Sequence, residues 1–174
     1  GRSVDTSMGL TPMEGLMMAT RSGSIDPGAV FHVIRHGMTA DAAEEDLDHR
    51  SGLLGVSGRS GDVRALLAAA SDGDTAAQLA LEMFARRAAA GIAAAATALP
   101  ALDAVVFSGG IGEHAAPVRE RIVERLGPLG LGPLPPGWGG ADAVHRPADG
   151  PAVLVVHARE DVVIAEATAA LVGA

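Results

Sequence analysis

The sequence predicts an α/β fold, in which helices cover a small sheet. Two apolar runs rich in valine, residues 102–107 and 152–158, have the length of buried strands. Capped helical patterns lie around them, and the order along the chain is strand, several helices, strand, helix, strand, helix. Only about three strands are visible, which makes a small sheet for so many helices.

The first part of the chain combines a weak strand pattern with a strong helix start. Residues 2–8 alternate weakly between polar and apolar and predict a short strand. Thr11 is then expected to cap a helix that has Pro12 at its first position and Glu14 completing a capping box. Gly23 is the expected end of this helix, and its methionine stripe is interpreted as core packing.

Further helices are expected before the first buried strand. Their ranges are 29–36, 39–52, 62–73 and 75–99. Short polar side chains supply the expected N-caps, namely Thr39 or Asp41, Asp62 and Asp74. Residues 53–62 are expected to form a loop. The acids of the second helix are interpreted as a solvated face and not as a metal cluster; they are Glu44, Glu45, Asp46 and Asp48.

The last part of the chain completes the α/β pattern. Residues 117–126 predict a helix whose arginines, Arg119, Arg121 and Arg125, point outward. Residues 127–150 are rich in glycine and proline and predict an ordered loop with at most short strand pieces. Residues 161–173 predict the closing helix.

Composition limits the classes of function. With 174 residues, the chain has the size of one domain, and its formal charge of −8 makes nucleic acid an unsuitable partner. It has no cysteines, which excludes a disulfide framework and thiolate metal sites and fits a cytoplasmic location. The longest apolar stretch, residues 88–99, is too short for a membrane span of about 20 residues.

One glycine-rich turn follows a predicted strand directly, in the stretch VVFSGGIGEH at residues 105–114. Gly110 to Ala115 satisfy G-x-G-x-x-A, but no second strand ending in an acid follows about 20 residues later, as a dinucleotide site requires. The turn is also not a P-loop, because no G-K-[ST] follows. Its glycines could hold a phosphate or a polar nucleoside edge, or they could simply form a tight turn.

Four stretches together resemble the acetate kinase family, the acetate and propionate kinases of the sugar kinase/Hsp70/actin superfamily. They are SVDTSMGLTPMEGLMMATRSGSIDP (3–27), SGLLGVSGRSGDVR (51–64), VVFSGGIGEH (105–114) and REDVVIA (159–165). The resemblance implies a ribonuclease H-like domain of the actin/Hsp70/sugar kinase type. It also implies reversible, Mg²⁺-dependent transfer of a phosphoryl group between ATP and acetate, which gives ADP and acetyl phosphate in a cytoplasmic homodimer.

The resemblance also assigns roles to residues. Arg21 corresponds to an arginine that reaches the transferring phosphoryl group, where planar positive donors suit the equatorial oxygens. Glu160 corresponds to the glutamate that holds Mg²⁺. Asp5 and Thr6 correspond to supporting residues near the cleft. The ATP pocket is assigned to Asp62, Val63, Arg64, Gly109, Gly110, Ile111, Gly112, Glu113 and His114.

Each charged residue also has a plainer interpretation by its type alone. Arg21 could offset a helix dipole, Asp62 could cap a helix, and Glu160 could favour a helix N-terminus. His114 stands where the family has asparagine, and an imidazole cannot supply a paired donor and acceptor. The remaining histidines have no metal-ligand spacing and are expected to be structural; they are His32, His36, His49, His145 and His157.

The resemblance covers one half of a two-domain kinase. It implies that residues 1–174 form the C-terminal nucleotide-binding and dimerisation domain, without the first strands of its sheet and without the N-terminal domain. We therefore expect negligible kinase activity from this polypeptide alone, and association through unpaired sheet edges. The alternatives are a non-catalytic nucleotide-binding or assembly module derived from such a kinase, a propionate or butyrate kinase, and an NAD-dependent enzyme.

Overall fold

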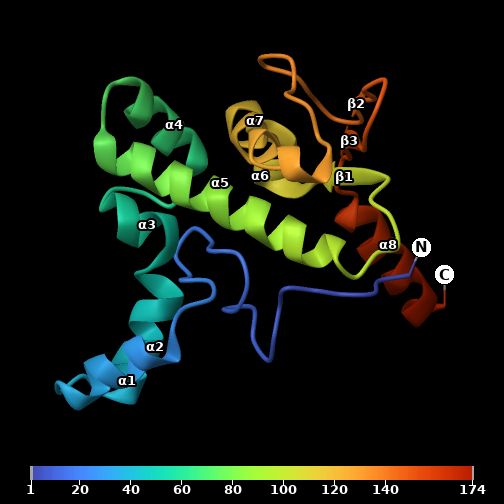
Figure 1. Cartoon of the computed structure of the whole chain (residues 1–174). Helices are drawn as coiled ribbons and strands as arrows, with labels where there is room; N and C mark the ends of the chain where they lie inside the picture. Colours follow the sequence, from blue (N-terminus) through green and yellow to red (C-terminus); the bar gives the residue numbers. More distant parts are fainter. Residues whose placement is uncertain (1, 174) are drawn as a thin grey trace.

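A long helix, α5 (Thr75–Ala96), is the centre of the fold. The computed structural model describes residues 2–173. Helices α3 (Gly52–Ser57), α4 (Val63–Ser71) and α7 (Ala116–Glu124) pack against α5 (Figure 1). The predicted N-cap of α5 is confirmed, because the Asp74 carboxylate accepts from the backbone N–H groups of Ala76 and Ala77.

The sheet has three strands among the described residues, in the order β1–β3–β2. Strand β1 (Ala104–Phe107) runs parallel to β3 (Ala152–Val155), with Val105 opposite Val153. The short β2 (Val144–His145) pairs antiparallel with β3 and lies within the predicted ordered loop, as does a 3₁₀ turn at Gly127–Leu129. The two buried strands expected from their valine runs are therefore confirmed, although both are shorter than predicted.

The core is built from small side chains along α5. Successive positions three and four residues apart face inward, which is the helical period. The buried residues of α5 are Ala77, Ala80, Leu81, Phe84, Ala85 and Ala89. Because most of them are alanines, the neighbouring helices can approach the α5 backbone closely.

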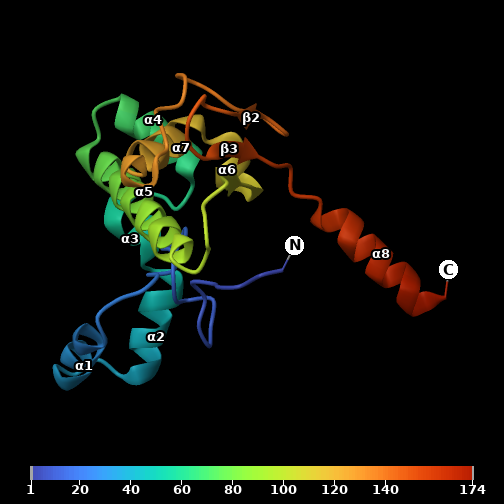
Figure 2. The same cartoon turned by 45° about the vertical axis from the view of Figure 1, so that its right-hand side comes forward.

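Three predicted helices extend from this core. Helix α1 (Pro27–Arg35) begins at the Asp26 cap, and α2 (Ala40–His49) begins at Thr39, which settles the choice between Thr39 and Asp41. Helix α8 (Glu160–Val172) has no buried residue, and Figure 2 shows it projecting away from the body. Within residues 2–173, no helix is long and apolar enough to cross a membrane.

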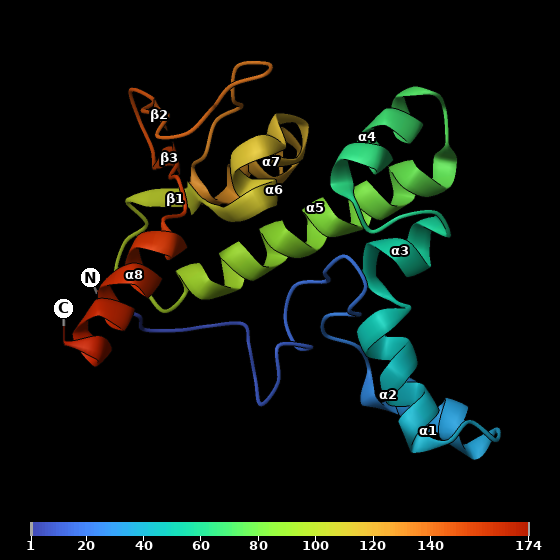
Figure 3. The same ribbon diagram turned by 180° about the vertical axis from the view of Figure 1, so that it is seen from behind.

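The first 25 residues differ from the prediction. The strand expected at residues 2–8 is absent, because no strand of the described chain lies beside it to pair its backbone. The helix expected after Thr11 is also absent. Thr11 Oγ1 accepts only from Met13 N–H in a local turn, and Gly15 and Ser24 are tied to each other by two hydrogen bonds. Figure 3 shows this irregular segment beneath α5.

Two further expectations were wrong. Residues 53–62 are not all loop, since α3 begins at Gly52, where its N–H groups find carbonyl partners in residues 18–20. Arg119 does not point outward, and its side chain is buried. Arg125 does lie near the surface, where it pairs with Glu82.

The α5 core gives a matched pair for a stability test. Leu81 is fully buried, whereas Leu79 on the same helix is 53% exposed. We expect Leu81→Ala to lower the free energy of unfolding by about 2–5 kcal/mol through lost burial and a cavity. Leu79→Ala should change it by about 0.5 kcal/mol or less. Urea unfolding followed by circular dichroism measures both, and equal losses would contradict this packing.

Candidate active site

The glycine turn forms a short helix, α6 (Gly109–His114), directly after β1. Gly109 has a φ of +72°, and a side chain at Gly112 would lie 3.2 Å from the carbonyl carbon of Phe107. These two positions therefore need glycine for the fold itself. Gly110 has no such structural requirement for glycine, because its φ is not positive and the space around it is open.

A cavity of about 950 Å³ lies against this helix. Gly110, Ile111 and Gly112 form one part of its wall, and Thr6 contributes to another. Much of the remaining wall is apolar and includes Phe84 of α5. The one glycine without a structural requirement thus faces a space large enough for a small organic ligand.

Glu113 turns away from solvent. Its Oε1 accepts from the backbone N–H groups of Gly109 (3.0 Å) and Ala158 (2.9 Å). Its Oε2 lies 2.7 Å from Nδ1 of His157. The hydrogen bond from Ala158, followed by that from His157, holds the pKa of Glu113 below its ordinary value against the opposing effect of burial. The side chain is therefore an ionised bridge between α6 and the chain after β3.

Arg119 of α7 holds the other end of α6. Its guanidinium donates to the carbonyls of Gly112 and Glu113, both at 2.9 Å. It also donates to the carbonyls of Trp138 (2.7 Å) and Gly139 (3.1 Å). Burial lowers the pKa of Arg119 below its ordinary value, with Glu120 acting in the opposite direction. A buried cation thus replaces water as the donor to four carbonyl groups.

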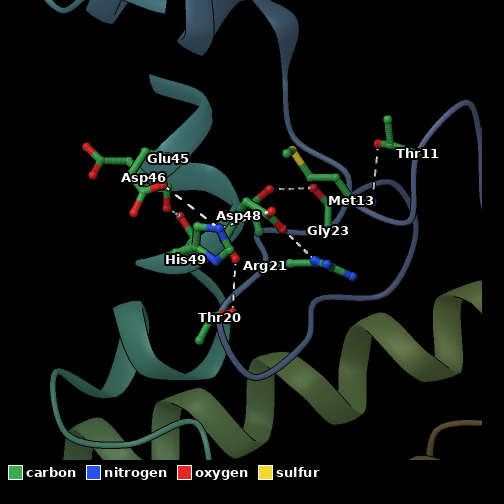
Figure 4. Close-up of polar contacts among 11 residues, drawn as sticks. Thr11, Met13, Thr20, Arg21, Gly23, Glu45, Asp46, Asp48 and His49 are labelled. Atoms are coloured by element: carbon green, nitrogen blue, oxygen red, sulfur yellow. Dashed lines mark hydrogen bonds and ion pairs between the residues drawn. The ribbon is translucent and has the colours of Figure 1, made fainter. Parts of the chain in front are cut away.

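Arg21 lies in a segment that α2 and α3 hold in place. Ser51 and Leu53 N–H groups donate to the carbonyls of Thr20 and Met18. The Arg21 side chain is 35% exposed and its Nε donates to Asp48 Oδ1 at 2.5 Å. Figure 4 shows this contact and the hydrogen bond from Thr20 to the Asp48 carbonyl. Asp48 is therefore more than part of a solvated acidic face.

The other predicted nucleotide residues lie at the start of α4. Asp62 caps this helix, because its carboxylate accepts from Arg64 N–H at 2.8 Å. It also pairs with the exposed Arg64 side chain at 3.0 Å, and this contact holds the pKa of Asp62 below its ordinary value. Val63 is buried in the core. Within this stretch, Arg64 presents the most accessible side chain, at 87% exposed.

Glu160, the predicted Mg²⁺ residue, is the first residue of α8 and is exposed. Among residues 2–173 it has no ion pair, and no group of three or more acidic, histidine or cysteine side chains could hold a metal. One free carboxylate fits Mg²⁺ when phosphate and water supply the remaining oxygens, because this ion binds few protein ligands beside a nucleotide.

The remaining predicted residues have local roles. Asp5 accepts from Thr6 N–H, and both side chains are exposed. Among the histidines, His157 contacts Glu113, while His145 meets Trp138 edge to face. His114 is exposed on α6.

The cavity brings together only some of the predicted residues. Gly110, Ile111, Gly112 and Thr6 line it, whereas Arg21, Asp62, Arg64 and Glu160 are not part of its wall. Sequence reasoning missed Asp48 and Arg119 as residues that position others. No local pattern marks Arg119, because its acceptors are carbonyls of separate segments. The spacing from Asp48 to Arg21 is likewise long-range.

The fold matches that of solved kinases. The structure of acetate kinase from Porphyromonas gingivalis aligns with a TM-score of 0.85 at 34% identity, over 95% of this chain and 43% of that one. A propionate kinase from Francisella tularensis aligns with a TM-score of 0.79 at 34% identity, over 92% and 42%. The predicted fold class, that of actin and the sugar kinases, is therefore confirmed.

Sequence comparison also assigns this chain to a family. The family model described as "Acetokinase family" matches residues 1–166, and the chain belongs to this family. The acetate kinase of Synechococcus sp. is 48% identical over 170 residues, which cover 96% of this chain and 42% of that protein. The chain thus spans about two-fifths of the length of the relatives it matches.

The Glu113 contacts predict a pH dependence of stability. Because its folded-state pKa lies below the ordinary 4.5, the ionised carboxylate stabilises the fold above that pH. This contribution is lost as the pH falls through the folded-state value. We expect the urea midpoint of the native chain to exceed that of Glu113→Gln at pH 7, and this difference to be smaller at an acidic pH below the ordinary value of 4.5. A gap that is the same at both pH values would contradict the assigned ionisation.

Proposed function

We propose that this chain is the C-terminal, nucleotide-binding and dimer-forming domain of a cytoplasmic acetate kinase, which transfers a phosphoryl group reversibly between ATP and acetate. Membership of the acetokinase family over nearly the whole chain carries the proposal. The open face of Gly110 on the cavity supports it, because a backbone without Cβ lets a flat ligand approach closely. In this proposal the adenosine contacts α6 and the start of α4.

Arg21 has the charge and the partial exposure needed to act on the phosphoryl group. A guanidinium presents donors in a plane that matches phosphoryl oxygens, and phosphoryl transfer depends mainly on such positioned charge. In this structure a carboxylate, Asp48, occupies it at a partly exposed position. A phosphoryl group with greater negative charge can take the place of Asp48 without uncovering a buried cation.

Glu160 would hold Mg²⁺ together with the nucleotide phosphates. When bound, the ion neutralises charge on the transferring phosphoryl group. Glu160 is free for this role because it is exposed at the start of α8.

A propionate kinase is the second candidate, since one solved propionate kinase has the same fold over 92% of this chain. One methylene changes binding in an apolar pocket by only about 1–3 kcal/mol. Comparing the KM values for acetate and propionate separates the two.

Nucleotide binding tests the proposal directly. We expect the chain to bind ATP in calorimetry and not NAD. Gly110→Ala should weaken ATP binding by about tenfold, because its methyl group occupies the open face of α6. The free energy of unfolding should stay the same or rise by up to about 1 kcal/mol, since alanine favours a helix.

Gly127→Ala is the matched control, because Gly127 also has open space around it and no positive φ but lies outside the cavity wall. It should leave ATP binding unchanged. Absence of ATP binding by the native chain, or equal affinities in Gly110→Ala and the native chain, would count against the proposed site.

Arg21→Ala tests the chemical role in the complete kinase. We expect kcat to fall by about 10³-fold, the lower range for a charge-stabilising arginine in phosphoryl transfer. The control is Arg50→Ala, because Arg50 also pairs with an acid of α2, Asp46, at 2.7 Å. The hydroxamate assay for acetyl phosphate measures both variants, and a normal kcat for Arg21→Ala would remove this role.

A further inference from the structure

Glu113 is a buried acid in the middle of a glycine-rich, otherwise accessible helix. Its side chain is only 4% exposed, whereas Gly110 and His114 on the same helix are exposed. An ionised group in such a position is stable only when its oxygens are satisfied by donors. The donors at Glu113 therefore show what the residue does for the chain.

Both carboxylate oxygens are occupied by this protein itself. One donor, Gly109 N–H, belongs to α6, and two donors, Ala158 N–H and His157 Nδ1, come from the segment 44 and 45 residues later. Hydrogen bonds to an ionised acceptor are stronger than those between neutral groups. The side chain cannot reach a ligand in the cavity without losing these contacts.

Beyond Val156, whose N–H donates to the Phe107 carbonyl at 2.9 Å, the Glu113 contact helps to fix the segment after β3. Ala158 lies two residues before Glu160, and α8 beyond it has no buried residue that could fix its direction. The other side-chain tether of this segment is Asp142, which accepts from His157 N–H at 3.3 Å and pairs with Arg159 at 3.5 Å. Asp142 is exposed, so its contacts compete with water, and Glu113 provides the buried tether.

Helix α6 is held from its other end as well. Arg119 fixes the carbonyls of Gly112 and Glu113, while the Glu113 carboxylate fixes the N–H of Gly109. Between these two anchors, Gly110 and Ile111 face the cavity. The wall that faces a ligand is thus rigid because its ends are fixed to different parts of the fold.

We propose that Glu113 is a positioning residue, which couples the glycine helix α6 to the segment that carries Glu160, so that nucleotide and metal are held in one fixed relation. This inference rests on the proposed function for the identity of the ligands. It changes the role of Glu113 from a ligand contact to a tether between two ligand-bearing segments.

Hydrogen exchange tests the tether without any ligand. In Glu113→Ala, the amides of Gly109 and Ala158 should both exchange about tenfold faster than in the native chain. The control is Asp142→Ala, which should speed exchange at His157 but leave Gly109 unchanged. Glu113→Gln should restore protection at Gly109 and Ala158, because its amide oxygen accepts from both while His157 changes tautomer. Unchanged exchange at Gly109 and Ala158 in Glu113→Ala would overturn the tether.

Ligand binding tests the coupling. ATP binding to Glu113→Ala should weaken by about tenfold, and the gain in affinity on adding Mg²⁺ should be lost. In Glu113→Gln, both should stay within about threefold of the native values. If the native chain binds no ATP, the proposed function fails while the exchange result still decides the tether. If the native chain binds ATP and Glu113→Ala binds it equally well with the same Mg²⁺ effect, the proposed role of Glu113 is wrong while the proposed function still stands.

A measurement on the native chain covers the case in which Glu113→Ala does not fold. ATP without Mg²⁺ is expected to bind at α6, yet it should also slow amide hydrogen exchange at Ala158. The reason is that the Glu113 side chain connects α6 to Ala158, so ordering of the helix also orders that segment. Slower exchange at Gly109 with no change at Ala158 would overturn the coupling.

Discussion

The close packing of helices on the alanine face of α5 determines where the rest of the structure can lie. Buried alanines let α7 approach the α5 backbone, and α7 carries Arg119. Arg119 then fixes the carbonyl end of α6 and the loop at Trp138 and Gly139. The glycine helix is therefore positioned by a sequence of contacts that begins in an apolar core and ends in a buried charge. A change in the spacing between α5 and α7 would move the cavity wall with it.

Local signals predicted the helices well and the first strand poorly. The aspartate caps at Asp62 and Asp74 work through residues two or three positions away, so the sequence contains all the information they need. A strand at residues 2–8 instead requires a partner elsewhere, and residues 2–173 provide none. The capping pattern at Thr11 failed for a related reason. Gly15 and Ser24 bond to each other across the segment, and a helix would break this loop.

The candidate site could be predicted only in part. The sequence predicted that the glycine cluster after β1 forms either a ligand contact or a tight turn. The structure shows that different glycines of the cluster fit these two roles. Gly109 and Gly112 serve the turn and its packing, whereas Gly110 leaves space open. Residue type alone did not reveal that Glu113 faces inward. A helical acid is usually solvated, and its donors at residues 157 and 158 become neighbours only once β1 and β3 have paired.

Some charged residues of the site already bind protein groups in the interior, whereas others are accessible to a ligand. Glu113 and the two terminal nitrogens of Arg119 are buried and hydrogen-bonded to protein groups, whereas Arg119 Nε has no partner among the described residues. Exchanging these partners for a ligand would leave buried N–H or carbonyl groups unpaired. Arg64 has an exposed partner, Arg21 has a partly exposed one, and Glu160 is exposed without an ion pair among the described residues. Groups that water already screens can change partners at small cost. We therefore expect a charged ligand to bind through Arg21, Arg64 and Glu160. The buried side chains of Glu113 and Arg119 then keep the glycine helix in place while the exposed residues change partners.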